Sequence, residues 1–338
     1  MKEAMFYEKL ENKRVKCNLC PHQCLISNFK KGICRVRENK EGILYTLVYG
    51  KVVSYAIDPV EKKPLYHFYP GASIFSLATV GCNFRCLNCQ NYSISQLPRE
   101  QNEIEGENFS PEEIISLTEK SNCQGIAYTY TEPTIFFEYA YEICQLARKK
   151  EIKNIFVTNG FISEEALRKI IPFMDAVNVD LKSFSEEFYK KICGASLKPI
   201  LNNLKIMKKR GVWIEVTTLI IPTLNDSEEE LKKIAKFILS LGEEVPWHLS
   251  RFYPTYKLKD LPPTPLETLH RAREIGLKMG IRYVYTGNVP GDEGENTYCY
   301  NCKKLLIRRY GYRIENFNLR DGRCRYCGTK IDGVGMKR

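Results

Sequence analysis

The sequence contains no uninterrupted apolar run that approaches the roughly 20 residues needed to span a membrane as a helix. Its first residues, 1–17, lack the apolar core and cleavage site of a signal peptide. It also contains no low-complexity tract and no repeat of fixed period. The composition, 43% hydrophobic and 27% charged, is that of a globular protein. We therefore expect a cytoplasmic protein without a membrane segment.

Cysteine is too scarce for a disulfide-stapled secreted scaffold. The 14 cysteines among 338 residues amount to about 4%, below the roughly 8–10% that is typical of such scaffolds. Thiols stay reduced in the cytoplasm, so clustered cysteines there usually indicate a metal site or catalysis. Eleven of them form three groups: Cys17, Cys20, Cys24 and Cys34; Cys82, Cys86 and Cys89; and Cys299, Cys302, Cys324 and Cys327.

The net charge of +11 follows the same division of the chain. The two flanking cysteine groups lie in basic segments, and the central group lies in a nearly neutral one. This pattern predicts a cysteine-rich N-terminal module over 1–72, a central domain over 73–288 and a C-terminal module over 289–338. A hairpin of Leu44–Tyr49 and Val52–Ile57 is expected to join the first module to the second.

The central domain alternates strand and helix patterns. Seven short runs, mostly apolar on both faces, predict strands at Ile74–Val80, Ile126–Tyr130, Ile155–Thr158, Ala176–Leu181, Val212–Leu219, Trp247–Arg251 and Ile281–Tyr285. Helices are expected over 134–150, 163–171, 185–193, 198–210, 227–241 and 265–280. Start signals stand at Ser110 with Glu113, Ser227 with Glu230, and Thr264-Pro265 with Glu267. Six or seven such units favour an α/β fold with a parallel (β/α)6-type TIM barrel, complete or partial, over an open doubly wound sheet.

Polar residues gather where the predicted strands end. They are Thr131 and Glu132 after the second strand, Asn159 after the third, Asp180 and Lys182 at the fourth, Glu215, Thr217 and Thr218 in the fifth, and Arg251 and Tyr253 at the sixth. The carboxyl ends of the strands of a parallel barrel open on one face, where active sites are built. We interpret the set as one ligand site, although each motif alone is equally typical of a strand-ending turn.

The central cysteines have the spacing C-x3-C-x2-C. Three thiolates do not complete a four-coordinate zinc site, but they can hold three irons of a cubic iron–sulfur cluster and leave the fourth iron open. An open iron can chelate a substrate. The alternative is a zinc site with a distant fourth ligand, for which the nearest histidine is His67, fifteen residues upstream.

The triplet, directly after the first predicted barrel strand, resembles the signature of radical S-adenosylmethionine (SAM) enzymes. Further likeness to their glycyl-radical-enzyme (pyruvate formate-lyase) activating branch lies in Asp58–Leu65, Tyr130–Pro133, Thr158–Gly160 and Val179–Lys182. In particular, the chain resembles the AmmeMemoRadiSam system radical SAM proteins, which begin with a C-x2-C-P-x2-C segment and end in a paired C-x2-C module. The resemblance covers essentially the whole chain.

The resemblance implies roles for individual residues. Cys82, Cys86 and Cys89 would ligate a [4Fe-4S] cluster whose open iron binds SAM. Glu132 would contact the SAM amino group, Lys182 its carboxylate, and Asp180 would help to organise the site. Further candidates for cofactor binding are Thr131, Asn159 and Arg251. The family pattern is broken where Tyr130 and Thr131 replace two glycines, Asn88 replaces an aromatic residue and Val157 replaces an aspartate.

The implied reaction begins with reduction of the cluster by ferredoxin or flavodoxin. SAM is then cleaved to methionine and a 5′-deoxyadenosyl radical, which abstracts hydrogen from a protein or peptide substrate. Two alternatives remain open at this point: a radical SAM enzyme acting on RNA or a small metabolite, and a non-catalytic cysteine-rich protein that binds metal and a partner.

The flanking cysteine groups are predicted to be structural. The C-terminal C-x2-C pairs indicate a zinc ribbon with Tyr310 and Tyr312 in its strands, with iron or an auxiliary cluster as the alternative. Basic residues such as Arg308 and Arg309 either form a nucleic-acid surface or offset the charge of the metal site. The N-terminal C-x2-C-x3-C-x9-C pattern suits zinc, with His22 as an alternative ligand, and equally suits an auxiliary iron–sulfur cluster.

Three cysteines remain outside the groups. Cys123, Cys144 and Cys193 are expected to be core thiols, and Cys193 has a weaker claim to a place at the barrel rim. His248 and His270 are expected to be packing or surface residues.

Overall fold

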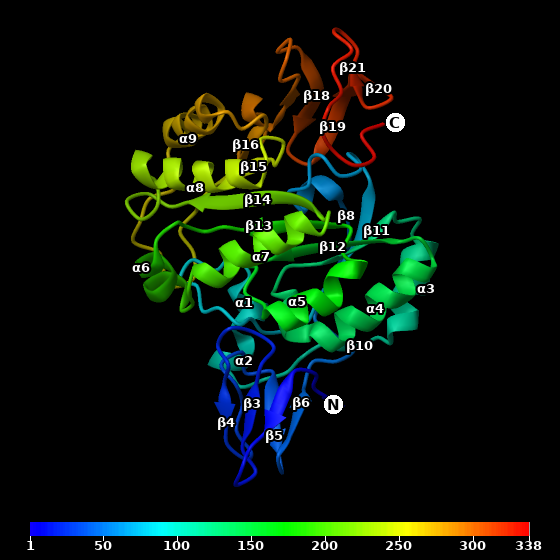
Figure 1. Ribbon diagram of the computed structural model, residues 1–338, viewed down its shortest axis with the longest axis vertical. Coiled ribbons are helices and arrows are strands. Elements are labelled where there is room, and N and C mark those ends of the chain that lie inside the picture. Colours follow the sequence, from blue (N-terminus) through cyan, green and yellow to red (C-terminus); the bar gives the residue numbers. More distant parts are fainter. Residues whose placement is uncertain (338) are drawn as a thin grey trace.

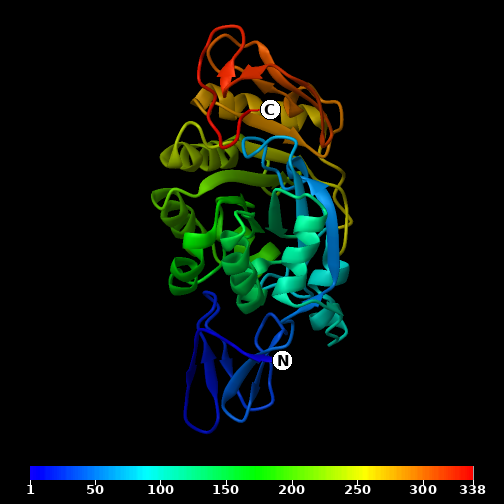
Figure 2. The same ribbon diagram turned by 90° about the vertical axis from the view of Figure 1, so that its right-hand side faces the viewer.

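The computed structural model describes residues 1–337. The N-terminal module lies at one end of the molecule and the C-terminal module at the opposite end, with the central domain between them (Figure 1, Figure 2). Within 1–337, no helix combines the length and the apolar character needed to cross a membrane.

An eight-stranded sheet forms the centre, in the order β16-β15-β14-β13-β12-β11-β9-β8. The strands are β8 (Ser54–Pro59), β9 (Ser73–Ala78), β11 (Gly125–Tyr128), β12 (Lys153–Thr158), β13 (Ala176–Asp180), β14 (Trp213–Ile220), β15 (Trp247–Arg251) and β16 (Val284–Gly287). All neighbours from β9 to β16 pair in parallel, and β8 is antiparallel to β9. The seven strands predicted for the central domain are confirmed, with their ends shifted by a few residues.

Helices follow the strands and cover the sheet. They are α1 (Tyr92–Ser95), α2 (Leu97–Glu100), α3 (Pro111–Lys120), α4 (Phe137–Lys149), α5 (Glu164–Ile170), α6 (Glu186–Phe188), α7 (Lys198–Lys209), α8 (Glu228–Leu241) and α9 (Leu266–Met279). Helices α4, α5 and α7 lie on one face of the sheet in both views (Figure 1, Figure 2). The sheet is mostly parallel and α/β in class, as predicted.

Two of the three predicted helix starts are confirmed. Ser110 forms a full capping box with Glu113 at the start of α3. Ser227 caps α8, but the Glu230 carboxylate accepts from Ser183 and from the Phe184 N–H instead of closing the box.

The predicted cap at Thr264 is wrong. The buried Thr264 hydroxyl accepts from the Phe252 N–H at 2.9 Å and donates to the Ile220 carbonyl at 2.6 Å. It therefore ties the segment before α9 to the sheet, and Pro265 takes the N-cap position without a side-chain hydrogen bond.

The predicted hairpin before the central domain is also wrong. Its first half contributes β6 (Ile43–Thr46), which pairs with strands of the N-terminal module. Its second half forms β8, which pairs with β9 along six residues as the antiparallel edge of the central sheet. Between them β7 (Lys51–Val52) pairs with β10 (Glu107–Asn108). Because the first half pairs within the N-terminal module and the second half pairs with β9, the two halves do not pair with each other.

Small antiparallel sheets build both flanking modules. The N-terminal module holds β1 (Lys2–Glu3), β6 and β5 (Arg37–Lys40) in one sheet and β2 (Tyr7–Lys9), β3 (Val15–Cys17) and β4 (Leu25–Ile26) in another. The C-terminal module holds β17 (Thr297–Tyr298), β18 (Leu305–Tyr310) and β19 (Arg313–Phe317), then β20 (Leu319–Arg320) and β21 (Arg323–Cys324). Tyr310 ends β18 as expected, whereas Tyr312 lies in the turn before β19.

The C-terminal module packs between the two edges of the central sheet. Its buried Leu306 and Ile307 share a core with Tyr285 of β16 and with Tyr66, which follows β8. The tail also pairs with this segment, because Phe68 and Val334 form a parallel bridge. The module thus covers the gap between β16 and β8, which are not hydrogen-bonded to each other in the described chain.

Arg309 fixes this packing and does not belong to a nucleic-acid surface. Its guanidinium donates to the Tyr66 carbonyl at 3.1 Å and to the Thr297 hydroxyl at 2.8 Å, and lies 4.1 Å from the centre of the Tyr66 ring. The Glu61 carboxylate lies 3.8 Å from its Nε, and both side chains are fully buried. Arg309 is therefore excluded from the nucleic-acid surface that was one of the two alternatives for these basic residues, while Arg308 is exposed.

We predict that Arg309→Ala destabilises the protein by about 3 kcal/mol, because it leaves the Glu61 carboxylate buried without a counter-charge. Urea unfolding followed by circular dichroism measures the change. Arg308→Ala removes the same charge from the adjacent exposed position and should shift the unfolding free energy by less than about 0.5 kcal/mol. Equal effects of the two substitutions would contradict the structural role of Arg309.

Candidate active site

A cavity of about 490 Å³ opens at the carboxyl ends of the parallel strands. It brings together eight of the nine residues that the sequence assigns to the central site: Cys82, Cys86, Cys89, Thr131, Glu132, Asn159, Asp180 and Lys182. They come from the segments that follow β9, β11, β12 and β13, so the parallel direction of the sheet is what gathers them. Tyr312 of the C-terminal module also lines this cavity.

The three central cysteines occupy the loop between β9 and α1. The Phe84 N–H donates to Cys82 Sγ at 3.3 Å, and the Asn159 amide lies 3.9 Å from the same sulfur. Cys89 Sγ and the Ser95 hydroxyl are 3.1 Å apart. These hydrogen bonds hold the sulfurs toward the cavity.

The spacing of these thiols does not suit a single ion. Within the described chain, only the four C-terminal cysteines bring three or more ligand atoms within 4.8 Å of one another. Sulfurs around one tetrahedral zinc ion lie about 3.8 Å apart, given a zinc–sulfur bond of about 2.3 Å. His67 supplies no fourth ligand, because it is buried and bonded to the Tyr285 hydroxyl and the Asp332 carbonyl. A cluster of several irons binds each thiolate at a different iron, so it does not need the three sulfurs to lie so close together.

Burial makes two of the three thiols depend on a cationic group to ionise. It raises the pKa of Cys82 well above its ordinary value, and the Glu132 carboxylate adds to this shift. Burial likewise raises the pKa of Cys89. Cys82 and Cys89 therefore keep their protons at neutral pH unless a positive metal centre binds them as thiolates.

A fourth thiol, Cys193, lies beside the triplet. It ends η4 (Tyr189–Cys193), a single π-helical turn, and its carbonyl accepts from the Arg85 N–H at 2.9 Å. Its thiol donates to Cys86, which lowers the pKa of Cys86 and raises that of Cys193. Gly194 follows with φ of +68°, and a side chain there would collide with Arg85. The sequence suggested a core thiol, and the Cys193-Gly194 pair was the only signal of a rim position.

Glu132 is buried at the floor of the cavity and accepts from four donors. Its Oε1 accepts from the Thr134 N–H at 3.0 Å, the Thr134 hydroxyl at 2.6 Å and the Thr158 hydroxyl at 2.7 Å, and its Oε2 accepts from the Asn159 N–H at 2.8 Å. Burial raises the pKa of Glu132 although these donors oppose the shift. Glu132 also caps η2 (Pro133–Phe136). The four bonds fix the carboxylate in place as a preorganised acceptor.

Asp180 and Lys182 lie on one side of the strand end and form an ion pair, with Nζ and Oδ2 2.8 Å apart. Burial would lower the pKa of Lys182, but the Asp180 carboxylate and the thiols of Cys86 and Cys193 outweigh it and raise the pKa. Lys182 therefore presents a permanent positive charge to the cavity beside the triplet.

Two buried polar atoms in the cavity wall have no partner among the described residues. They are Asn88 Oδ1 and Thr217 Oγ1. Buried polar atoms are almost always hydrogen-bonded, so these two indicate a polar ligand in the cavity. Together with the acid of Glu132 and the cation of Lys182, they suit a ligand that carries charges of both signs.

A wall of charged residues was missed by the sequence analysis. Asp58 accepts from Lys62 at 2.8 Å, from Lys63 at 2.6 Å and from the Tyr130 hydroxyl. Lys62, Lys63 and Tyr130 line the cavity, and the Lys63 ammonium lies 4.4 Å from the centre of the Tyr130 ring. Burial lowers the pKa of Lys63 to about 8, while Asp58 opposes that shift. The only signal was the segment Asp58–Leu65, which carried family likeness but no assigned role.

Arg251 is not part of the cavity. Its Nε donates to the Thr264 carbonyl at 2.8 Å, and its Nη1 lies 3.3 Å from the Tyr253 hydroxyl. Its neighbour Ser250 lines the cavity instead, since successive side chains of a strand point to opposite faces.

Glu215 and Thr218 also lie away from the cavity. Glu215 is buried beneath it and accepts from the N–H groups of Tyr66 and His67 and from His248. Thr218 donates to the Leu181 carbonyl. Of the three polar residues expected from this strand, Thr217 alone reaches the cavity.

The C-terminal cysteines form a compact four-sulfur site. The sulfurs of Cys299 and Cys327 are 3.6 Å apart, and those of Cys302 and Cys324 are 3.7 Å apart. These separations match the edge of a tetrahedral zinc–thiolate site. The N-terminal cysteines instead line a separate small pocket with His22.

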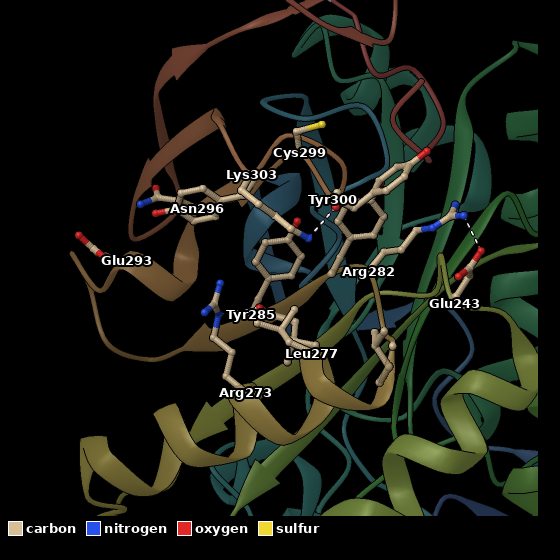
Figure 3. Close-up of a pocket in the computed structure, with 15 residues that line it drawn as sticks. Glu243, Arg273, Leu277, Arg282, Tyr285, Glu293, Asn296, Cys299, Tyr300 and Lys303 are labelled. Atoms are coloured by element: carbon tan, nitrogen blue, oxygen red, sulfur yellow. Dashed lines mark hydrogen bonds and ion pairs between the residues drawn. The ribbon is translucent and has the colours of Figure 1, made fainter. Parts of the chain in front are cut away.

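A larger cavity, about 660 Å³, lies between α9, β16 and the C-terminal module (Figure 3). Its three cations already have partners. Arg282 pairs with Glu243 and Asp332, Lys303 donates to the Tyr300 carbonyl at 2.6 Å, and Arg273 donates to the Val284 carbonyl at 2.9 Å. Of the predicted site residues it contains only Cys299, whose role is in the four-sulfur site. The larger cavity therefore contains fewer candidate catalytic or ligand-binding residues than the smaller one.

Comparison with known proteins finds similarity over the central domain. Residues 76–238 match the family model described as the radical SAM superfamily. An uncharacterized protein of Methanocaldococcus jannaschii is 51% identical over 99% of this chain and 100% of its own. The pyruvate formate-lyase-activating enzyme of Clostridium pasteurianum is 25% identical over 54% of this chain and 80% of its own.

Solved structures share the fold at low identity. Streptococcus suis SuiB bound to S-adenosylmethionine aligns with a TM-score of 0.52 and 11% identity, over 71% of this chain and 56% of SuiB. A radical SAM methyltransferase from Sphaerobacter thermophilus aligns with a TM-score of 0.51 and 13% identity, over 68% of this chain and 71% of its own.

The charged wall of the cavity yields a test by double-mutant cycle. We predict that Asp58→Asn destabilises the protein by about 3 kcal/mol, because it leaves the Lys63 ammonium buried without its counter-charge. Lys63→Met should also destabilise it, and the double variant should lose at least about 1 kcal/mol less than the sum of the two. Denaturant unfolding of the four proteins measures the cycle, and strict additivity would contradict the coupling.

Proposed function

This chain belongs to the radical SAM superfamily, and from that membership we propose that its cavity binds a [4Fe-4S] cluster and SAM and that the protein abstracts hydrogen from a protein or peptide substrate. A cluster held by the three cysteines and reduced by a ferredoxin or flavodoxin would supply the electron for cleavage of SAM to methionine and a 5′-deoxyadenosyl radical. The observation that carries the proposal is the set of three thiols, one buried and two half-buried, that line a cavity with an acid, a cation and unpartnered polar atoms. In this proposal the six parallel strands from β9 to β15 are the partial (β/α)6-type barrel.

Each end of the amino-acid part of SAM has a matching group in the wall. Cys82, Cys86 and Cys89 would hold the cluster and leave one of its irons free for SAM. The Glu132 carboxylate, fixed by four donors, receives the SAM ammonium through a charge-assisted hydrogen bond. Lys182 attracts the SAM carboxylate, and Asp180 holds Lys182 in position at 2.8 Å. The cavity preorganises these charges and excludes water from the reacting atoms.

Asn88 Oδ1 is a free acceptor in the wall for the adenosine part of SAM. It takes the place that the family gives to an aromatic ring, so a hydrogen bond replaces stacking there. Thr131 acts indirectly, because its hydroxyl donates to the Thr79 carbonyl at 2.8 Å and thereby fixes the loop that carries Glu132.

A protein or peptide substrate is favoured by the relatives. Besides the clostridial protein, an Escherichia coli pyruvate formate-lyase 1-activating enzyme is 22% identical over 61% of this chain and 89% of its own. The case for RNA is weaker than the sequence suggested, since Arg309 is buried under Tyr66 and is not on the surface.

The C-terminal four-sulfur site is proposed to hold a structural zinc ion. Its sulfur separations of 3.6 and 3.7 Å support one tetrahedral ion and not a cluster. A filled site would tie the ends of the module together, since Cys299 and Cys302 precede β18 and Cys324 and Cys327 follow β20.

SAM cleavage tests the function directly. We expect the anaerobically reconstituted protein to form 5′-deoxyadenosine from SAM after addition of dithionite, with peptide or protein substrates raising the yield. Cys86→Ala should abolish the product because it removes one of the three cluster ligands. Cys123→Ala, outside the cavity, is the matched control and should retain it. A protein that holds iron and sulfide but forms no 5′-deoxyadenosine would refute the enzymatic proposal.

Glu132→Gln is predicted to weaken SAM binding roughly tenfold to one-hundredfold, because a charge-assisted hydrogen bond becomes a neutral one. Equilibrium dialysis of radiolabelled SAM with the reconstituted protein measures the dissociation constant. Glu165→Gln, an exposed acid on α5, is the control and should leave it unchanged. Equal affinities for all three proteins would show that Glu132 serves only as a helix cap.

A further inference from the structure

The N-terminal cysteines form a site that the proposed function does not use. Cys17, Cys20, Cys24 and Cys34 line one small pocket, together with apolar side chains such as Ile26 and Ile135. All four are free thiols. No carboxylate lines this pocket, so sulfur is the ligand type that it offers to a metal.

The spacing of these four thiols differs from that of the C-terminal four. Within the described residues no three of them lie within 4.8 Å of one another, whereas the C-terminal sulfurs do. In this respect the N-terminal group resembles Cys82, Cys86 and Cys89, which line one cavity and likewise do not bring three sulfurs within 4.8 Å of one another in the described chain. A single zinc ion draws four sulfurs to about 3.8 Å, whereas in a cubic cluster each thiolate binds a different iron and the sulfurs stay farther apart.

His22 lines the same pocket as the four cysteines. Its Nε2 lies 2.8 Å from the Asn83 carbonyl oxygen, and its ring packs edge-on against Phe161 with the centroids 5.0 Å apart. This contact occupies Nε2 and leaves Nδ1 as the nitrogen through which a histidine held in this way could bind a metal. The four cysteines already supply one sulfur for each iron of a cubic cluster, so a cluster does not need His22 as a ligand.

A buried cation without a full set of partners faces the same pocket. Arg37 lines the pocket and is 1% exposed. Its two terminal nitrogens bond to the Glu138 carboxylate and the Met5 carbonyl, whereas its Nε has no acceptor among the described residues. A buried donor without a partner is rare, and it indicates an acceptor that is absent from the protein chain itself. The sulfides and thiolates of an iron–sulfur cluster are such acceptors.

From these observations we infer that the N-terminal module holds a second [4Fe-4S] cluster, ligated by Cys17, Cys20, Cys24 and Cys34. The orphaned Arg37 Nε indicates a sulfur acceptor in the pocket. The choice between zinc and iron–sulfur, which the cysteine pattern left open, rests on the spacing of the sulfurs. The site is also joined to the central triplet. His22 bonds to the carbonyl of Asn83, the residue after Cys82, and the Asn83 amide oxygen accepts from Asn159 at 2.9 Å.

Metal analysis of the full-length protein tests this inference without any SAM chemistry. The variant with Cys82, Cys86 and Cys89 all changed to Ala should, after anaerobic reconstitution, retain about four irons and four sulfides per chain. Its dithionite-reduced form should give the electron paramagnetic resonance signal of a [4Fe-4S] cluster, unchanged by SAM. Adding Cys20→Ala and Cys24→Ala should remove both the iron and the signal. His22→Ala in the triple variant should leave both in place.

The C-terminal zinc ion serves as the marker of folding. Each variant should retain about one zinc per chain, so that loss of iron is not mistaken for unfolding. A triple variant with no iron and about two zinc ions per chain would overturn the inference in favour of a second zinc site. If the triple variant retains iron while the wild-type protein does not cleave SAM, the proposed function is refuted and the inference of an N-terminal cluster stands.

Discussion

The parallel pairing of seven strands is the constraint on which the rest of this structure depends. Strands β9 to β16 run in one direction, so the segments that follow them meet at one edge of the sheet. Residues far apart in the chain, such as Cys82 and Lys182, share a cavity for this reason alone. Any change in the direction of one strand would remove its contribution to the site.

Buried charges connect the three parts of the molecule. Arg37 of the N-terminal module pairs with Glu138 of α4 at 2.5 Å, and both side chains are almost fully buried. At the opposite end, Arg309 of the C-terminal module lies against Glu61, which follows β8. A buried charge is costly when its partner is lost, so these pairs favour one arrangement of the modules over looser alternatives. Hydrophobic contact alone is less selective about position.

The sequence predicted the elements of this fold better than their side-chain directions. Short apolar runs located the seven parallel strands, because strands covered on both faces are apolar throughout. The same uniform pattern does not show which alternate side chains of a strand face the cavity. Arg251 was therefore assigned to the cavity that its neighbour Ser250 lines. Thr264 looked like a helix cap because its bonds to Phe252 and Ile220 depend on contacts distant in sequence.

Metal chemistry was predictable only as far as ligand type. The spacing C-x3-C-x2-C identified the central triplet, but the chain pattern of the N-terminal four is compatible with two metals. What separates them is the distance between sulfurs, which the folded module sets and the residue spacing does not. The lysines at positions 62 and 63 were missed for a similar reason, since their place in the cavity wall depends on Asp58 and Tyr130.

Tyr312 occupies the turn between β18 and β19 and reaches the cavity, although the rest of its module is remote from the cysteine triplet. The boundary of the cavity is thus shared between the ends of the parallel strands and the tip of one hairpin of the C-terminal module. The two are held by separate forces: hydrogen bonding across the sheet fixes the first, and four sulfurs and Arg309 fix the second. The length and sequence of a single turn can therefore change the outer edge of the cavity while its floor stays as it is.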